Sequence, residues 1–291
     1  MTDNGLDTTA RLRRGEYRLR KIGTWLRYRW AVASHVVPRH WLRRGPDGLP
    51  LPPGGFIHAV SGSYDAGWFL KSGALGYAAL ISALRDVNPA AEDIEMVLDF
   101  GCGCGRVARH WPLNKPLQFH GVDTNPHLVH WCQKNLEPGR FTSNAPDPPL
   151  VFEPETFDLI YAFSVLTHLG EQRQMAWMTE FERLLRPSGW LVVSTHGEHA
   201  ARLLPAPERE DFNAGRLVVT TYGTEGGNDW NAFHPRRYFE DVTAAAFECV
   251  EFRAEGALGN PPQDLFVLRR RSPTDEPYGT RFRDRSGFAV A

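Results

Sequence analysis

The chain has 291 residues, of which 42% are hydrophobic and 23% charged, with a formal net charge of -1. This length and composition suit one large α/β domain with additions, and no run approaches the roughly 18 apolar residues of a membrane-spanning helix. The sequence shows no apolar stretch typical of a secretion signal, and four cysteines are too few to need a disulfide framework, so we expect a cytoplasmic protein.

The charge is unevenly distributed along the chain. Residues 1–50 contain eleven of the 33 Lys and Arg residues and four of the 34 acidic residues, so the remainder is acidic overall. A basic arm on an acidic body indicates a partner for the arm rather than nucleic-acid binding by the core. We therefore expect no specific nucleic-acid partner.

Residues 11–37 predict one amphipathic helix. Its apolar side chains fall within a stripe about 80° wide that is bordered by arginines, and they are Leu12, Leu19, Ile22, Leu26, Trp30, Ala33 and Val37. Three interpretations are open: the stripe packs on the acidic body or on a second subunit, it lies peripherally on an anionic membrane, or the arginines contact nucleic-acid phosphates.

Proline and glycine divide the rest of the chain. Residues 43–55 (RRGPDGLPLPPGG) predict a linker. We therefore expect a helical extension and linker over 1–55, an α/β domain over 56–270, and a flexible tail over 271–291. Within the domain, 66–86 predicts a helix. The segment 197–233 predicts a long irregular connection, typical of a lid or a substrate-specificity element.

Strands and helices alternate from residue 96 onward. Strands are predicted at 96–100, 117–122, 157–162, 189–195, 247–253 and 264–270, with a weaker one at 150–152. Helices are predicted at 104–111, 126–137, 171–186 and 235–246. Such alternation predicts a mostly parallel sheet that is covered by helices on both faces.

A glycine loop, LDFGCGCGRVARH at 98–110, follows the first of these strands. One residue separates Cys102 from Cys104, and no second pair of ligand spacing follows, so we expect no metal and no redox pair. The glycines after a strand instead indicate a backbone that approaches a ligand at the carboxyl edge of the sheet. Arg106 stands where a dinucleotide fingerprint requires glycine.

With Asp99 before the loop, DFGCGCG resembles motif I, (D/E)xGxGxG, of class I S-adenosylmethionine-dependent methyltransferases. FDLIYAFSVLTHL (157–169) resembles motif IV of this superfamily, and LLRPSGWLVVSTHG (184–197) resembles the helix, turn and strand that follow it. The resemblance covers about residues 66–270, with the motifs in the family order. It implies a Rossmann-like sheet of seven strands, mostly parallel, with an antiparallel last strand.

The resemblance also implies a set of S-adenosylmethionine-binding residues. Those expected at the methionine part are Asp99, Gly101, Cys102, Gly103, Gly105 and Arg106. Asp123 and Thr124 would hold the ribose and adenine, since a carboxylate accepts hydrogen bonds from both ribose hydroxyls; the alternative for Asp123 is a helix N-cap. Asn144 and Ala145, or alternatively Asp147, would meet the adenine amine. Phe163, Ser164 and His168 would line the sulfonium side, and Tyr64 and Trp68 would cover the cofactor.

An oxygen acceptor must lose a proton during methylation, and histidine suits this role near neutral pH. His168, His196 and His234 are candidate bases; the alternative for each is a helix cap or a buried hydrogen bond. We expect O-methylation of a small molecule, sugar or glycan. N-methylation of a small molecule or protein, and a non-catalytic cofactor-binding partner, are the alternatives. A (D/N)PP(F/Y) motif is absent after the fourth strand, where AFSVL stands.

Overall fold

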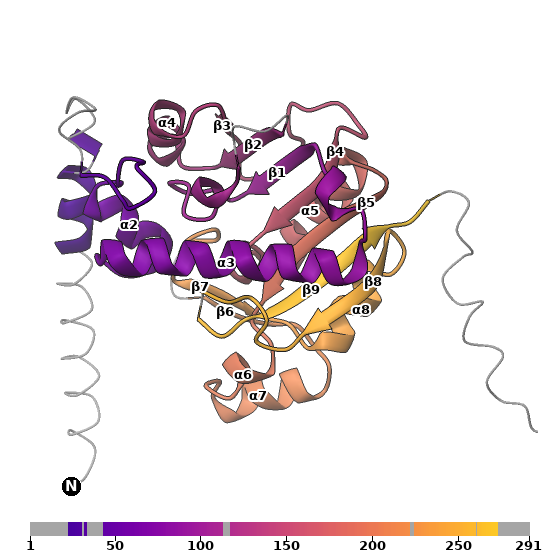
Figure 1. Ribbon diagram of the computed structural model, residues 1–291. Helices are drawn as coiled ribbons and strands as arrows, with labels where there is room; N and C mark the ends of the chain where they lie inside the picture. The colour runs from indigo at the N-terminus through magenta and orange to yellow at the C-terminus, as the bar shows by residue number, and fades with distance from the viewer. Residues whose placement is uncertain are drawn as a thin grey trace, which may run out of the picture.

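The computed structural model describes residues 23–30, 32–33, 43–112, 117–221, 224–259 and 261–272. Its centre is a seven-stranded sheet in the order β3-β2-β1-β4-β5-β9-β8 (Figure 1). The strands are β1 (Met96–Phe100), β2 (Gln118–Asp123), β3 (Arg140–Ser143), β4 (Phe157–Ala162), β5 (Leu185–Thr195), β8 (Phe247–Arg253) and β9 (Asp264–Arg270). Strands β1 to β5 are parallel, and β9 is antiparallel to both neighbours. The predicted fold class is confirmed.

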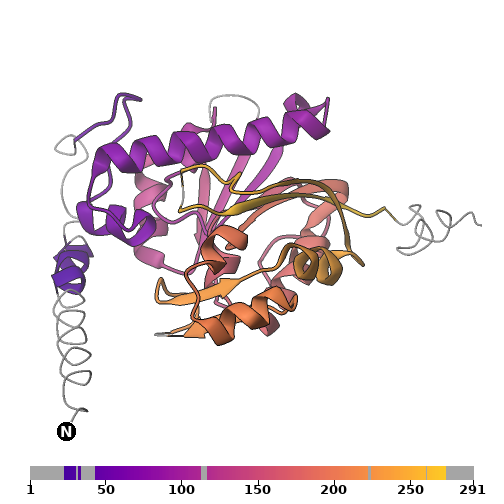
Figure 2. The ribbon, with the colours of Figure 1, turned by 90° about the horizontal axis from the view of Figure 1, so that it is seen from below.

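Helices cover both faces of the sheet (Figures 1 and 2). They are α2 (Gly54–Ser61), α3 (Ala66–Val87), α4 (Pro126–Asn135), α5 (Glu171–Leu184), α6 (Glu198–Ala201), α7 (Ala206–Asn213) and α8 (Arg236–Thr243). The long helix α3 crosses one face together with α2 and α4, whereas α5 and α8 pack on the other.

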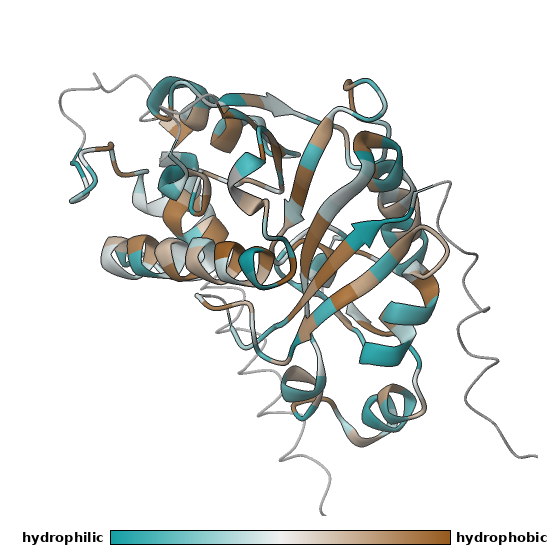
Figure 3. Ribbon diagram, turned by 45° about the vertical axis from the view of Figure 1, so that its right-hand side comes forward, coloured by the Kyte–Doolittle hydropathy of each residue, from teal (hydrophilic) through white to brown (hydrophobic). Residues whose placement is uncertain are grey.

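The two-sided burial explains the apolar runs in the strands. Successive side chains of a strand point to opposite faces; accordingly Val97 belongs to the core cluster that includes Leu80 of α3, and Leu98 to the cluster that includes Phe181 of α5. Brown stretches follow the central strands in Figure 3. A sheet buried on both faces needs such runs, because polar alternation would put polar groups into one of the two cores.

Two predicted elements near the sheet are wrong. Residues 150–152 form no strand, because side chains of α5 pair with their backbone groups: Leu150 N donates to Glu180 Oε1 at 2.8 Å, and the Phe152 carbonyl accepts from Arg183 Nη1 at 3.0 Å. The edge strand is β3, at 140–143. No α-helix occupies 104–111. Gly105 has a φ of +77°, which interrupts helical geometry, and only the 3₁₀ turn Ala108–His110 forms before Pro112.

Two segments expected to be irregular contain regular structure. In the predicted linker, Arg44 and Pro50 form a β-bridge and Asp47 pairs with the buried Arg109, and helix α2 follows at once. The connection 197–233 contains α6, α7 and a two-stranded sheet of β6 (Val218–Thr221) and β7 (Trp230–Phe233). The domain boundaries at 55 and 270 stay predictions.

The predicted helix 11–37 is described only at residues 23–30 and 32–33, which are helical and are called the N-terminal helix below. Its other residues lie outside the described chain, as do residues 222–223 of the predicted lid segment and most of the predicted tail. Among the described residues, no helix is long and apolar enough to cross a membrane.

Candidate functional site

The turn after β1 is folded tightly against its surroundings. The amide groups of Gly101 and Cys102 both donate to the Val122 carbonyl at the end of β2, at 2.8 and 3.0 Å. Gly101 has a φ of +81° and Gly103 of +54°. A Cβ atom on Gly101 would lie 2.4 Å from Val165 Cγ2, so only glycine fits here.

The thiols of this turn are packed into the core. Cys104 is fully buried, and its Sγ lies 3.7 Å from the Phe56 carbonyl. Burial raises the pKa of Cys104, and the neighbouring Cys132 together with burial raises the pKa of Cys102. Both thiols are therefore protonated at neutral pH, which suits packing rather than ligation.

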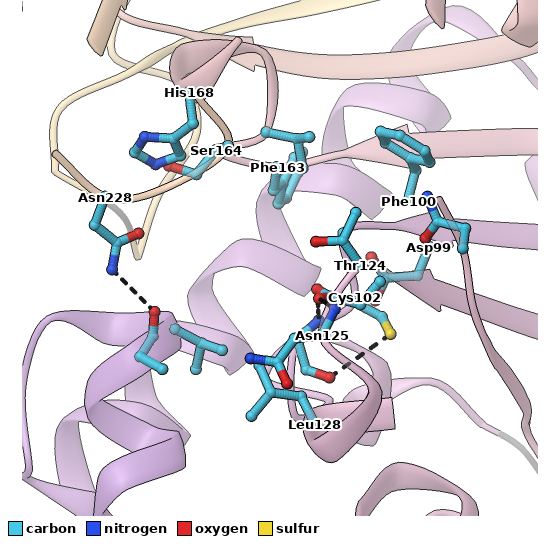
Figure 4. A pocket seen from close by; sticks show the side chains of 18 of the residues that line it. Asp99, Phe100, Cys102, Thr124, Asn125, Leu128, Phe163, Ser164, His168 and Asn228 are labelled. Atoms are coloured by element: carbon cyan, nitrogen blue, oxygen red, sulfur yellow. Dashed lines mark hydrogen bonds between the residues drawn. The ribbon is translucent and has the colours of Figure 1, made fainter. Parts of the chain in front are cut away.

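A cavity of about 380 Å³ opens at the carboxyl edge of the sheet, beside this turn (Figure 4). Eleven of the predicted site residues line it: Asp99, Gly101, Cys102, Gly103, Arg106, Asp123, Thr124, Asn144, Phe163, Ser164 and His168. Further lining residues are Ala59, Val60, Phe100, Val107, Asn125, Leu128, Pro146, Val165, Leu169, Trp177, Gly226, Gly227 and Asn228.

Two carboxylates reach the cavity from adjacent strands. Asp123, at the end of β2, accepts from the amides of Gly103 at 2.9 Å and Asn125 at 2.8 Å, while its burial raises its pKa. Asp99 of β1 is 4% exposed, and burial raises its pKa to about 7, against the opposing effect of the Tyr161 hydroxyl. A bound ammonium group would restore the charged form of Asp99.

Asp123 is not the N-cap of helix α4, which was the alternative role for this residue. The residue before α4 is Asn125, whose side-chain oxygen accepts from His127 N at 3.1 Å. Asp123 therefore positions the glycine turn, and its carboxylate still lines the cavity.

Asn144 also lines the cavity, and its Nδ2 donates to the Ala145 carbonyl at 2.7 Å. The Oδ1 of Asn144 is buried and has no partner among the described residues. Asp147, the alternative residue, is exposed and pairs with Arg173, and neither Asp147 nor Ala145 is among the described lining residues. The geometry therefore favours Asn144 as the acceptor for an amine.

The three candidate histidines occupy different environments. His168 lines the cavity, and its Nδ1 lies 2.8 Å from the Trp230 carbonyl. Because a carbonyl only accepts, Nδ1 must carry the proton, so Nε2 of the neutral ring holds the lone pair. Burial lowers the pKa of His168, so the ring is neutral at pH 7.

His196 and His234 are not among the described residues that line the cavity. Gln263 Nε2 lies 3.2 Å from His196 Nε2, and burial lowers the pKa of His196 to about 4. His234 is fully buried against Gln174 Oε1 at 2.9 Å, and burial lowers its pKa to about 3. Their surroundings match the structural alternative, a buried hydrogen bond.

The remaining predicted residues lie outside the cavity lining. Tyr64 and Trp68 are each 37% exposed, and the Tyr64 ring stacks on His58 at 4.3 Å. Gly105 lies behind the turn, where a Cβ would meet Leu136 at 2.2 Å.

The match to known proteins agrees with this geometry. The family described as "Methyltransferase domain" matches residues 98–193, which include the glycine turn, both carboxylates and His168. Residues 98–193 therefore carry a methyltransferase domain, and the match supports the resemblance to class I S-adenosylmethionine-dependent methyltransferases.

Two curated proteins are similar to part of this chain, each at less than 30% identity. "Probable methyltransferase PMT5" of Arabidopsis thaliana is 27% identical over 169 residues, covering 57% of this chain and 22% of that protein. "O-methyltransferase rstn1" of Aspergillus nomiae is 28% identical over 107 residues, or 34% of this chain and 46% of that protein. The chain thus spans less than half the length of either. A solved S-adenosylmethionine-dependent methyltransferase of Methanosarcina mazei is 19% identical, with a TM-score of 0.48 over 61% of this chain and 92% of that one.

The residues present fit the cofactor of this superfamily. Gly101 and Gly103 present bare backbone to the cavity, and Asp123 presents a half-buried carboxylate to it. The unpartnered Asn144 Oδ1 is an acceptor that requires a donor. A ribose diol, an adenine amine and an ammonium group are the donors that S-adenosylmethionine carries.

The sequence did not identify which residues of the predicted lid segment, 197–233, reach the cavity: Gly226, Gly227 and Asn228 line it. Asn228 Nδ2 donates to the Ala59 carbonyl of α2 at 3.1 Å, across 169 residues of sequence (Figure 4). The loop is held by Gly226 N, which donates to the His168 carbonyl at 2.8 Å, and by Glu225, which accepts from Gly170 N at 2.7 Å. The glycine pair in TEGGND (224–229) is the only local signal, and it does not indicate where the loop packs.

Proposed function

We propose that this protein transfers a methyl group from S-adenosylmethionine to an oxygen of a small molecule, sugar or glycan, with His168 as the general base. The observation that carries the proposal is the tautomer of His168: the Trp230 carbonyl holds the proton on Nδ1, which leaves Nε2 free to accept one. The loop 224–230 supplies this carbonyl and also closes the cavity.

The cofactor, when bound, supplies an activated methyl on a sulfonium, whose departure needs no acid. What remains for the chain is to hold an acceptor in line and to take its proton. His168 suits this role, because burial keeps the ring neutral and the backbone fixes its orientation. Asn228 and Ala59 join the two sides of the cavity mouth, which limits access of water to the reacting atoms.

The lining favours an uncharged acceptor. The charged residues of the described lining are Asp99, Asp123 and Arg106, which belong to the glycine-turn side. Near His168 in the sequence, the lining residues are Phe163, Ser164, Val165 and Leu169, which are apolar or neutral. A hydroxyl group on a neutral ring or sugar suits such a wall better than a cationic amine does.

The substitution His168→Asn tests the proposal, because an asparagine amide retains a donor for the Trp230 carbonyl but is no base. We expect kcat to fall by about 10²–10⁴-fold, with S-adenosylhomocysteine affinity unchanged within about threefold. Burial lowers the pKa of His168, so kcat/KM of the wild type should begin to fall only at a pH lower than the ordinary histidine pKa of about 6.5. The variant should lack this decrease. His196→Asn is the matched control, since His196 lies outside the cavity lining.

Activity would be followed as transfer of labelled methyl to panels of hydroxylated and amine acceptors. Full activity of His168→Asn, or transfer confined to amines, would overturn the O-methylation proposal. Cofactor binding without turnover across both panels would instead favour a non-catalytic partner.

A further inference from the structure

The N-terminal helix contacts the body through one side only. Tyr28 OH donates to Asn125 Oδ1 at 2.9 Å, and its ring centroid lies 5.7 Å from that of Phe56. Val32, one turn later, packs against the same core cluster. The helix stands beside α2 at the edge of the molecule in both ribbon views (Figures 1 and 2).

The opposite side is the apolar stripe that the sequence predicts. At about 100° per residue, Leu26, Trp30 and Ala33 lie opposite Tyr28. Leu26 is 55% exposed and Trp30 is 71% exposed, and Ala33 is also exposed. For these residues, the interpretation that the stripe packs on the acidic body is wrong, and the stripe has no cover within the described chain.

Positive charge borders the stripe on both sides. Arg27 and Arg29 fall on its two flanks and are exposed; the Arg27 guanidinium lies 4.6 Å from the Tyr64 ring centroid, and that of Arg29 lies 5.6 Å from the Trp25 ring. No ion pair between described residues includes either arginine. In the sequence, six further basic residues precede the helix between positions 11 and 21.

We propose that the N-terminal helix docks this protein on an anionic phospholipid bilayer, with Leu26 and Trp30 in the interfacial layer and Arg27 and Arg29 at the headgroups. Tryptophan and a leucine face bordered by arginines are the composition of helices that lie in this interface. Anionic lipid phosphates and carboxylates supply the counter-charge that the described chain lacks.

A second copy of the chain fits the face less well. A two-fold dimer contact pairs a patch with itself, so the arginine flanks would meet arginine flanks. The three stripe side chains that the structure describes, Leu26, Trp30 and Ala33, also fall far short of the roughly 800 Å² per partner that a stable interface buries. The proposal does not depend on the methyltransferase activity, because the docking face points away from Asn125 and the cavity.

Cosedimentation of the full chain tests the proposal, with sucrose-loaded vesicles of phosphatidylcholine alone or with about 30% phosphatidylserine. We expect pelleting with anionic vesicles at low salt, less at moderate salt, and little with neutral vesicles. Leu26→Glu with Trp30→Glu should reduce the bound fraction about tenfold or more. The matched control, Val151→Glu, changes an apolar residue that is 85% exposed on the body and should bind like the wild type.

A second pair of substitutions separates the contribution of the arginines to membrane binding from that of the apolar side chains. Arg27→Gln with Arg29→Gln should weaken binding at low salt and flatten its salt dependence, whereas the circular dichroism melting midpoints of all variants should match the wild type. Absence of pelleting, or equal pelleting of Leu26→Glu/Trp30→Glu and the wild type, would overturn the proposal. If the wild type does not pellet with vesicles but forms a concentration-dependent dimer, and Leu26→Glu/Trp30→Glu abolishes that dimer, the face binds a second copy of the chain instead.

Discussion

The glycine turn packs closely against α2, so adding one methyl group to Gly103 should lower the free energy of unfolding. Gly103 has a φ of +54°, and a Cβ there would lie 2.5 Å from Val60 Cγ1, a side chain that also lines the cavity. Gly103→Ala should therefore lower the free energy of unfolding by two contributions, about 1–2 kcal/mol for the left-handed backbone and about 1–3 kcal/mol for overpacking. The total expected is about 3 kcal/mol.

Two further variants separate these contributions in urea denaturation. Gly48→Ala has a similar φ of +76° with nothing within 4 Å, so it should show the backbone cost alone, about 1 kcal/mol. Val60→Ala removes the clashing atom, so the double variant Gly103→Ala/Val60→Ala should recover about 1–3 kcal/mol relative to additivity. The same double variant should partly restore S-adenosylhomocysteine affinity lost in Gly103→Ala. Equal costs for Gly103→Ala and Gly48→Ala, or strict additivity with Val60→Ala, would refute the reasoning.

Two other predictions concern buried charge. His234 has a pKa of about 3 when folded against about 6.5 when unfolded, so its stabilising effect is complete above pH 6.5 and is lost as the pH falls. At pH 5 the wild type should have lost about 2 kcal/mol of its free energy of unfolding through His234. The difference in unfolding free energy between the wild type and His234→Phe should therefore narrow by that amount from pH 8 to pH 5. A difference that does not change with pH would contradict a neutral, buried His234. Asp47→Ala should lower the free energy of unfolding by about 3 kcal/mol in thermal or urea denaturation, because the buried Arg109 guanidinium loses its carboxylate partner and retains only carbonyl acceptors. Arg109→Met added to Asp47→Ala should recover part of this cost, and no recovery would show that the ion pair is not the cause.

The sequence predicts the parts of the fold whose signals are local. The bounds of β1, β4, β8 and β9 agree with prediction, because more than half of the residues in each are apolar. Glycine follows β1, and arginine ends β8 and β9. The resemblance predicts Asp99 and Asp123, because Asp99 is the acid of motif I and Asp123 is the acid at the end of the following strand. Strand β3 was missed because it buries only Phe141 and therefore has no apolar run.

What the sequence does not predict depends on distant partners. The role of each histidine follows from the residue that faces its ring, and these partners lie 62 positions away for His168, 67 for His196 and 60 for His234. Helix α2 and Asn228 meet across 169 residues to close the cavity. No local pattern encodes such contacts, because packing of the whole chain decides them.

Calorimetric titration with S-adenosylhomocysteine tests the central claim, that the cavity beside the glycine turn holds the cofactor. We expect the wild type to bind one equivalent, and Asp123→Ala to bind about 100-fold more weakly, because it loses a half-buried carboxylate that accepts charge-assisted hydrogen bonds. Absence of binding to the wild type, or equal affinity of the folded Asp123→Ala variant, would contradict the claim.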